Sequence, residues 1–348
     1  MDPEVLIRTE GQVGRITLNR PQALHALTTA MCLEMIEALT AWREDPRVVL
    51  VMLDHAGDRG FCAGGDIRAL VDSLAEGGEA AEAFFYTEYQ LDHLIFSYPK
   101  PVLALMDGVV MGGGAGISLP ATFRVATERT RFAMPETGIG LFPDVGACWR
   151  LARMPDHAGA WLALTGARIG PADCELLGIV TDYLEAARLE DFKSAVLADP
   201  AAVETLLTEF EADPGRPPFA AHQDEVARLF GAASPEALVA GLEADGSEWA
   251  LAQRDIILSK SPLSTAVALR QLQASAAIEN FAQQMEMEYR IALRLIRKPD
   301  FSEGVRATIL DKDRSPRWRP GSLAEVTPQM VDEVFAPLPP DKAWTPLP

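Results

Sequence analysis

The stretch KPVLALMDGVVMGGGAG, residues 100–116, joins an apolar strand to a glycine-rich turn. Residues 102–106 form a continuous apolar run, typical of a strand that is buried on both faces. Asp107-Gly108 predicts a turn, and four glycines within residues 112–116 precede a short helix. Glycines begin a helix poorly, so they indicate a backbone that a ligand approaches closely or, alternatively, tight helix–sheet packing.

A second glycine loop, FCAGGD at residues 61–66, also lies between an apolar strand and a helix. Glycine leaves backbone N–H groups uncovered, and the start of a helix adds a partial positive charge. The alternative interpretation is a tight turn in which Asp66 caps the helix. Backbone N–H groups near Gly65 and Gly113 could meet at one carbonyl oxygen and form an oxyanion hole.

A third segment, MPETGIGLFPDVG at residues 134–146, holds two carboxylates in an otherwise apolar, Gly- and Pro-rich setting. Loss of solvation raises carboxyl pKa values and favours general acid or base catalysis. Glu136 and Asp144 are therefore candidate catalytic residues. The alternative is a surface loop with two solvated acids.

The order of elements predicts an α/β core with parallel strands. We expect strands at residues 11–18, 48–53, 102–106, 123–126 and 131–134 and helices from Thr28 or Thr29 to Trp42, after residue 66 and over 80–97. The predicted core spans residues 1–185. Residues 186–348 form an added region, helical to about residue 298 and then Pro-rich and irregular.

Composition excludes several classes of function. A net charge of −19 argues against nucleic acid as a partner, and no apolar run approaches the ~20 residues that span a bilayer. The N-terminal sequence carries two acids before its first Arg, unlike a secretory signal or a transit peptide, so we expect a cytoplasmic protein.

Other catalytic motifs are missing from the sequence. The four cysteines form no CxxC and the five histidines no HxxxH, so no metal site is expected. The glycine loops match neither GxGxxG nor GxxxxGK[ST], and Ser118 lacks a GxSxG frame. No histidine is obviously paired with Cys62, so we expect a buried structural thiol there.

At these residues the chain resembles the crotonase (enoyl-CoA hydratase/isomerase) superfamily. The resemblance is carried by ITLNRP, FCAGGDI, KPVLALMDGVVMGGGAG and MPETGIGLFPDVG. FFYTEYQLDHLI, MEMEYR and FSEGVRATILDKDRSPRWRP resemble its 3-hydroxyisobutyryl-CoA hydrolase branch. The resemblance implies a crotonase-like spiral of repeated ββα units with an added C-terminal helical region.

The resemblance also implies roles for individual residues. Gly65 and Gly113 would supply the oxyanion hole, Glu136 and Asp144 the catalytic carboxylates, and Glu88 a contact to the substrate. The acyl-CoA would be bound by the loop of Ala63, Gly64, Asp66 and Ile67, together with Gly113. As our own hypothesis, Arg59 and Arg68 form a basic patch for the CoA phosphates.

One departure from the family pattern favours hydrolysis. Hydratases of this superfamily carry a catalytic Glu where this sequence has Gly116. We therefore expect hydrolysis of a short 3-hydroxyacyl-CoA, with Glu136 either attacking the thioester or activating water. CoA belongs to the substrate, and no separate cofactor or metal is expected.

Two other functions remain open: an enoyl-CoA hydratase or isomerase, and a non-catalytic acyl-CoA-binding subunit. The resemblance also implies a homo-oligomer, although the C-terminal region could instead cover the chain's own site.

Overall fold

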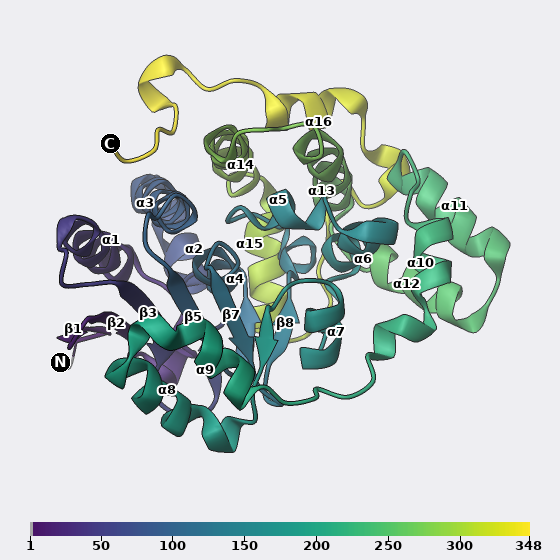
Figure 1. Ribbon diagram of the computed structural model, residues 1–348. Helices are drawn as coiled ribbons and strands as arrows, with labels where there is room; N and C mark the ends of the chain where they lie inside the picture. The colour runs from purple at the N-terminus through teal and green to yellow at the C-terminus, as the bar shows by residue number, and fades with distance from the viewer. Residues whose placement is uncertain (1–2) are drawn as a thin grey trace.

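The computed structural model describes residues 3–348 and contains two sheets surrounded by helices (Figure 1). The six-stranded sheet has the order β1-β2-β3-β5-β7-β9, and the three-stranded sheet has the order β4-β6-β8. Only β1 and β2 pair antiparallel; the remaining pairs are parallel. The strands are β1 (Val5–Glu10), β2 (Val13–Leu18), β3 (Leu50–His55), β4 (Gly60–Cys62), β5 (Val102–Met106), β6 (Val109–Met111), β7 (Phe123–Ala126), β8 (Arg131–Ala133) and β9 (Asp182–Tyr183).

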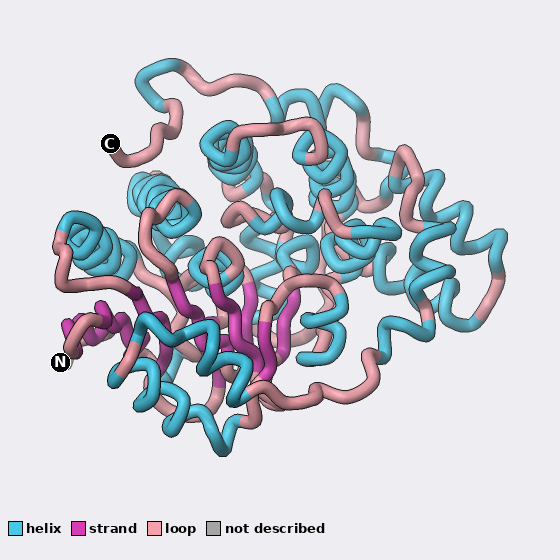
Figure 2. The backbone as a smooth tube through the Cα atoms, viewed as in Figure 1, coloured by secondary structure: helices cyan, strands magenta, loops and turns pink. Residues whose placement is uncertain are grey.

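Helices cover both faces of the large sheet, as the backbone trace shows (Figure 2). They are α1 (Thr29–Glu44), α2 (Ile67–Ala75), α3 (Glu79–Phe96), α4 (Gly113–Ser118), α5 (Ala147–Leu151), α6 (Ala158–Thr165), α7 (Pro171–Leu176), α8 (Leu189–Ala198), α9 (Val203–Phe210), α10 (Gln223–Leu229), α11 (Pro235–Asp245), α12 (Glu248–Leu258), α13 (Pro262–Ser275), α14 (Phe281–Leu295), α15 (Pro299–Val305) and α16 (Pro328–Phe335).

The predicted repeat of two strands and a helix is confirmed. A long strand enters the large sheet, a short strand enters the small sheet, and a helix follows: β3-β4-α2, then β5-β6-α4. In a third unit, β7-β8 leads into a 3-10 helix at Glu136–Ile139. Because the small-sheet strands pair with each other, the turns that follow them come close together. Both glycine loops and Glu136 follow such strands.

Strand β5 is buried along its whole length, as its apolar sequence predicts, and it and β7 have the predicted bounds. The expected strand at 48–53 is displaced to Leu50–His55. The strand continues through Asp54, which is buried and pairs with Arg15 and Lys193. Strand β1 was not predicted; it lies at the sheet edge and most of its side chains are at least partly exposed.

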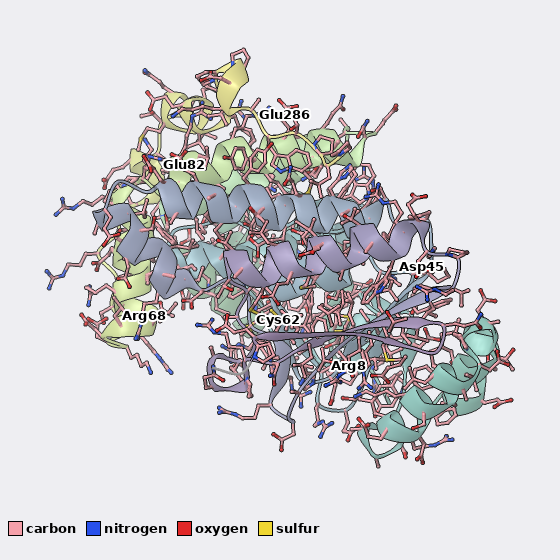
Figure 3. The ribbon with its side chains drawn as sticks, turned by 90° about the vertical axis from the view of Figure 1, so that its left-hand side faces the viewer. Arg8, Asp45, Cys62, Arg68, Glu82 and Glu286 are labelled. Carbon is pink, nitrogen blue, oxygen red and sulfur yellow. The ribbon has the colours of Figure 1, made fainter. Side chains whose placement is uncertain are left out.

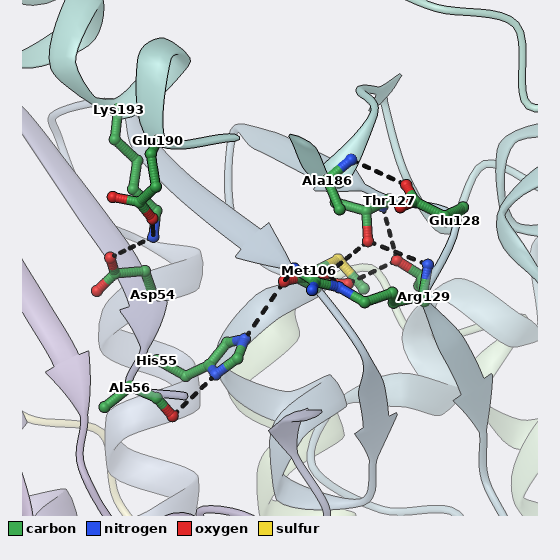
Figure 4. Close-up of polar contacts among 12 residues, drawn as sticks. Asp54, His55, Ala56, Met106, Thr127, Glu128, Arg129, Ala186, Glu190 and Lys193 are labelled. Carbon is green, nitrogen blue, oxygen red and sulfur yellow. Dashed lines mark hydrogen bonds and ion pairs between the residues drawn. The ribbon is translucent and has the colours of Figure 1, made fainter. Parts of the chain in front are cut away.

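The added region packs on two sides of the core. Helices α8 and α9 form a cluster with one face of the large sheet, whereas α10–α14 share the main hydrophobic core (Figure 1). Lys193 on α8 contacts Asp54 at 3.2 Å, and nearby His55 and Arg129 contact Asp107 (Figure 4). The buried Lys193–Asp54 pair joins α8 to the end of β3. The division at residue 185 stays a prediction.

The expectation that residues 299–348 are irregular is wrong for two segments. Helices α15 and α16 both have proline at their first turn, where its missing N–H leaves no hydrogen bond unmade. The tail then returns across α14 to α3, where Trp344 Nε1 donates to the carbonyl oxygen of Tyr86 at 3.2 Å. Across residues 3–348, no helix is both long and apolar enough to cross a membrane.

Candidate active site

A cavity of about 490 Å³ lies where the turns after the small-sheet strands meet helix α3. Apart from the expected basic patch, its walls include all but one of the residues expected from the sequence: Ala63, Gly64, Gly65, Ile67, Glu88, Gly113, Glu136 and Asp144. The exception is Asp66. Its carboxylate accepts from the N–H of Ala69, as an N-cap, and pairs with Arg20 at 2.7 Å. Asp66 therefore shapes the loop from outside the cavity.

The two glycine loops face each other across one wall of the cavity. A Cβ on Gly64 would lie 3.7 Å from the nitrogen of Gly113. Among the described residues, the N–H groups of Gly65 and Gly113 donate to no protein acceptor. Each loop therefore presents a free backbone donor, as an oxyanion hole requires.

Two further contacts explain why side chains are excluded from these loops. A Cβ on Gly65 would meet the ring of Phe84 at 2.7 Å, and one on Gly113 would meet Glu88 Oε1 at 2.3 Å. Larger residues at either position would displace the donors. The glycines are therefore needed for tight packing and for ligand access, so both interpretations of the glycine loops apply.

The carboxyl groups of Glu136 and Asp144 are both buried, each side chain being 6% exposed. This excludes the interpretation of a solvated surface loop. Burial raises the pKa of Glu136 well above its usual range, and the charge of Asp144 adds to the rise. Burial also raises the pKa of Asp144, to about 6, against a hydrogen bond from Tyr89. Near neutral pH the pair therefore carries one negative charge, favoured on Asp144, and holds one proton.

Tyr89 determines which way Asp144 points. Its hydroxyl, on α3, donates to Asp144 Oδ2 at 2.7 Å inside the protein. The neighbouring Glu88 faces the cavity, and its Oε1 has no hydrogen-bond partner among the described residues. One turn further along α3, Asp92 is fully buried and both its carboxyl oxygens lack a partner in residues 3–348. Sequence analysis found Glu88 through its resemblance to the hydrolase branch but missed Tyr89 and Asp92.

The turn after Asp144 has a strained backbone. Val145 has φ 55°, which is unfavourable for a β-branched residue, and Gly146 follows with φ 74°. Such a conformation costs roughly 1–3 kcal/mol and persists only where the surroundings impose it. A Cβ on Gly116 would lie 2.7 Å from Val145 Cβ and 2.7 Å from Asp92 Oδ1. Residue 116 must therefore be glycine for this turn and Asp92 to occupy their positions.

Basic residues lie along the cavity wall, but not those expected from the sequence. Arg59 and Arg68 are exposed and line no part of the cavity. Figure 3 shows Arg68 at the surface. Arg168, Lys260 and Arg314 line it instead, from three distant segments. None of these three makes an ion pair with another described residue. Their separation in the sequence, by up to 146 positions, left no local pattern that could identify them.

The C-terminal tail covers part of the chain's own cavity, one of the two possibilities left open by the sequence. Thr308, Ile309 and Arg314 belong to the cavity wall.

Cys62 is buried beside the first loop, and burial raises the pKa of its thiol to about 12, which disfavours a nucleophilic thiolate. In the described part of the chain, no group of three His, Cys, Asp or Glu side chains is placed to hold a metal ion.

Comparison with known proteins identifies the family to which this fold and cavity belong. The family model described as enoyl-CoA hydratase/isomerase matches residues 13–335. The chain therefore belongs to the enoyl-CoA hydratase/isomerase family, the crotonase superfamily. A curated relative from Danio rerio, named 3-hydroxyisobutyryl-CoA hydrolase, mitochondrial, is 41% identical over 96% of this chain and 90% of its own length.

Two solved structures with different names are also similar to this chain. One is described as a carnitinyl-CoA dehydratase from Mycobacterium thermoresistibile, with 37% identity, a TM-score of 0.93 and coverage of 97% of this chain and 98% of its own. The other is described as an enoyl-CoA hydratase from Rhodobacter sphaeroides 2.4.1, with 40% identity, a TM-score of 0.91 and coverage of 99% and 100%. The fold is thus shared by proteins named for hydrolysis and for hydration, and site chemistry must distinguish them.

The mitochondrial name of the Danio rerio relative contradicts the expected cytoplasmic location. That expectation was wrong because it rested on the acids before the first Arg. The charge of a few residues does not identify the compartment of the protein.

Proposed function

We propose that the protein hydrolyses 3-hydroxyisobutyryl-CoA to the free acid and CoA. The observation that carries the proposal is the pair of free N–H groups on Gly65 and Gly113, in the same cavity as Glu136 and Asp144. A thioester carbonyl oxygen held by both donors would be stabilised as it becomes negative, each donor contributing roughly 3–4 kcal/mol in the transition state. The name of the similar Danio rerio protein supports the acyl group.

Glu136 can act in either of two ways, and both begin from a pair that holds one proton and one charge. In the first, the proton of the pair passes from Glu136 to Asp144, the Glu136 carboxylate attacks the thioester carbon, the C–S bond breaks, and the thiolate takes that proton from Asp144. Water then opens the resulting anhydride and restores the carboxyl group. In the second, after the same proton transfer, the Glu136 carboxylate takes a proton from water as that water attacks the carbon, the C–S bond breaks, and the thiolate takes the proton from Asp144. Neither route uses a cofactor beyond the CoA of the substrate.

We propose that Arg168, Lys260 and Arg314 bind the CoA phosphates. CoA carries several negative charges, and the chain has a net charge of −19, so the two should repel each other. These three residues offset the repulsion, because they place unpaired positive charge at the cavity. Burial lowers the pKa of Lys260, and the charge of Arg168 lowers it further. A bound phosphate would offset that repulsion.

Hydration is the competing function, and the names of the two solved structures favour it. The packing around Gly116 weighs against it. Any side chain there would collide with Asp92 and Val145, so a second carboxylate cannot enter at that position without moving both. The acids that line the cavity are then Glu88, Glu136 and Asp144.

The deciding experiment measures two reactions of the purified protein. We expect release of free CoA from 3-hydroxyisobutyryl-CoA and little hydration of crotonyl-CoA. A panel of short acyl-CoA esters tests which acyl group is preferred. Glu136→Gln should lower the rate of CoA release by about 100-fold or more, as expected for the loss of a catalytic acid or base. Faster hydration than CoA release would reject the proposal.

Isotopic water separates the two routes for Glu136. In a single turnover in labelled water, attack by Glu136 places label in its carboxyl group when the anhydride is opened at that carbon. Direct attack by water leaves Glu136 unlabelled and puts all the label in the product acid. Mass spectrometry of the peptide that contains Glu136 reads the difference.

We also propose that the protein forms a homo-oligomer. A surface hollow lined by Phe96, Trp149 and Phe281 supports this, since Phe96 is 41% exposed and its ring stacks on Phe281. An exposed aromatic ring beside a surface hollow is common at subunit contacts. Light scattering of the eluting protein measures the mass, and a value near 37.7 kDa would contradict the proposal.

A further inference from the structure

Helix α14, from the added C-terminal region, packs against the turn that carries Asp144. A Cβ on Gly146 would meet Phe281 Cζ at 2.4 Å and Met285 Sδ at 3.3 Å. Positions 281, 285 and 288 lie on one face of a helix, so the side chain of Glu288 also faces this turn. The turn is thus enclosed by a helix that begins 135 residues after it.

Glu288 makes a direct hydrogen bond to this turn. Its Oε2 accepts from the backbone N–H of Gly146 at 2.6 Å. Its Oε1 accepts from the side-chain amides of Gln271, at 3.0 Å, and Gln284, at 2.7 Å. The side chain is 0% exposed. Three donors therefore hold the carboxyl group in place. Two of them are glutamine side chains, and the third is the Gly146 N–H, through which Glu288 contacts the turn.

That hydrogen bond joins the turn where its backbone is most strained. Val145 and Gly146 both have positive φ, and Asp144 immediately precedes them. Tyr89 holds the carboxyl end of Asp144 from α3, and Glu288 holds the backbone two residues later from α14. Without an acceptor for the Gly146 N–H, the turn is free to relax and Asp144 to move away from the cavity.

We propose that Glu288 is a positioning residue for Asp144, acting through the Gly146 N–H to keep the catalytic turn in its strained conformation. This inference rests on the proposed function, because Asp144 is assigned there as a member of the catalytic pair. It gives the C-terminal helical region a part in catalysis: α14 supplies the group that holds the turn. The role requires an oxygen acceptor at this point, and a carboxylate or an amide can supply it.

Two substitutions separate a positioning role from a packing role. Glu288→Met keeps much of the volume but removes the acceptor. Glu288→Gln keeps an oxygen that accepts from the Gly146 N–H. Its new amide N–H can donate to the side-chain oxygen of Gln271 or Gln284, neither of which has a partner among the described residues. Glu286→Gln is the matched control, since it makes the same chemical change two residues away on the exposed side of α14 (Figure 3).

We expect Glu288→Met to lower kcat about 10- to 100-fold, the usual effect of losing a group that orients a functional residue, with KM within about twofold. Glu288→Gln should restore most of kcat, and Glu286→Gln should match the wild type. All kcat values are taken well below each variant's Tm. A wild-type kcat in Glu288→Met, or an equal loss in Glu288→Met and Glu288→Gln, would overturn the proposal.

Hydrogen–deuterium exchange provides a readout that does not depend on the reaction. Peptides covering residues 143–148 should exchange faster in Glu288→Met than in the wild type, and at the wild-type rate in Glu288→Gln. Unchanged exchange in Glu288→Met would refute the role of Glu288 in holding the turn. If the wild type releases no CoA, the proposed function fails while the exchange result still decides whether Glu288 holds the turn.

Discussion

The hydrogen bond from Tyr89 to Asp144 makes a quantitative prediction about the pH dependence of catalysis. In the proposed mechanism, the pair formed by Glu136 and Asp144 is active when it carries one negative charge, and the pKa of Asp144 is about 6. The rate should therefore fall as the pH drops through about 6. Tyr89→Phe removes the donor at 2.7 Å from Asp144 Oδ2 and keeps the ring that fills the space.

The direction of the change follows from which form the hydroxyl stabilises. Tyr89 donates to the ionised carboxylate, so its removal destabilises the anion and raises the pKa at which the pair first ionises. A hydrogen bond to a charged group contributes about 1.5–3 kcal/mol, and one pKa unit corresponds to about 1.36 kcal/mol. The pH at which the rate falls should therefore be higher by about 1–2 units in the variant. At pH 6 the variant would be about 5- to 50-fold slower, and at pH 9 within about twofold of the wild type.

The assay is the loss of thioester absorbance, with kcat measured from pH 5 to 9 at constant ionic strength. Tyr86→Phe is the control, because Tyr86 lies on the same helix and its hydroxyl contacts Thr345 near the surface at 3.0 Å. The reasoning is refuted if Tyr89→Phe leaves the pH profile in place or moves it to lower pH. An equal loss of rate at every pH would show that Tyr89 acts by packing and not through ionisation.

Three further substitutions test the cavity and its support. Burial raises the pKa of Asp92 well above its usual range, so the folded protein keeps a proton that the unfolded chain releases above about pH 4. Asp92→Asn should therefore be more stable than the wild type at pH 7 in urea denaturation, by about 1.4 kcal/mol for each unit by which pH 7, or the folded pKa if that is lower, exceeds 4, and a lower stability would contradict this. Arg314→Ala should raise KM about tenfold at unchanged kcat, equivalent to one charge-assisted contact of about 1.5 kcal/mol, whereas the exposed Arg59→Ala should not. Lys193→Met should lower the free energy of unfolding by about 3 kcal/mol, because it leaves Asp54 buried with less compensation, and adding Asp54→Asn should recover part of the loss.

Much of the core and of the cavity could be predicted because its signals are local. The apolar run at Val102–Met106 is a strand with the predicted bounds, and Thr28 caps α1 as expected. Gly65, Gly113, Glu136 and Asp144 were found because each stands in a short segment whose neighbours restrict the backbone or exclude water. Errors occurred where a distant partner changes a residue's environment: Asp54 continues a strand because Lys193 neutralises it.

The residues that surround Glu136 and Asp144 could not be predicted in this way. Tyr89 and Glu288 lie on helices where an aromatic or an acid has many possible roles, and only packing brings them to Asp144 and Gly146. Arg168 and Arg314 meet at one cavity although no sequence pattern joins them. For Asp66, the structure decides between the two interpretations that the sequence left open, because its side chain caps α2.

By itself, the sequence determined the order of strands and helices, the two glycine loops and the identity of the acids between them, because backbone preference and apolar periodicity act over a few neighbouring residues. The tertiary structure alone decided the charge state of the acids, the orientation of Asp144 and the source of positive charge at the cavity. Those properties depend on burial and on distances between segments far apart in the chain, which exist only once the chain has folded.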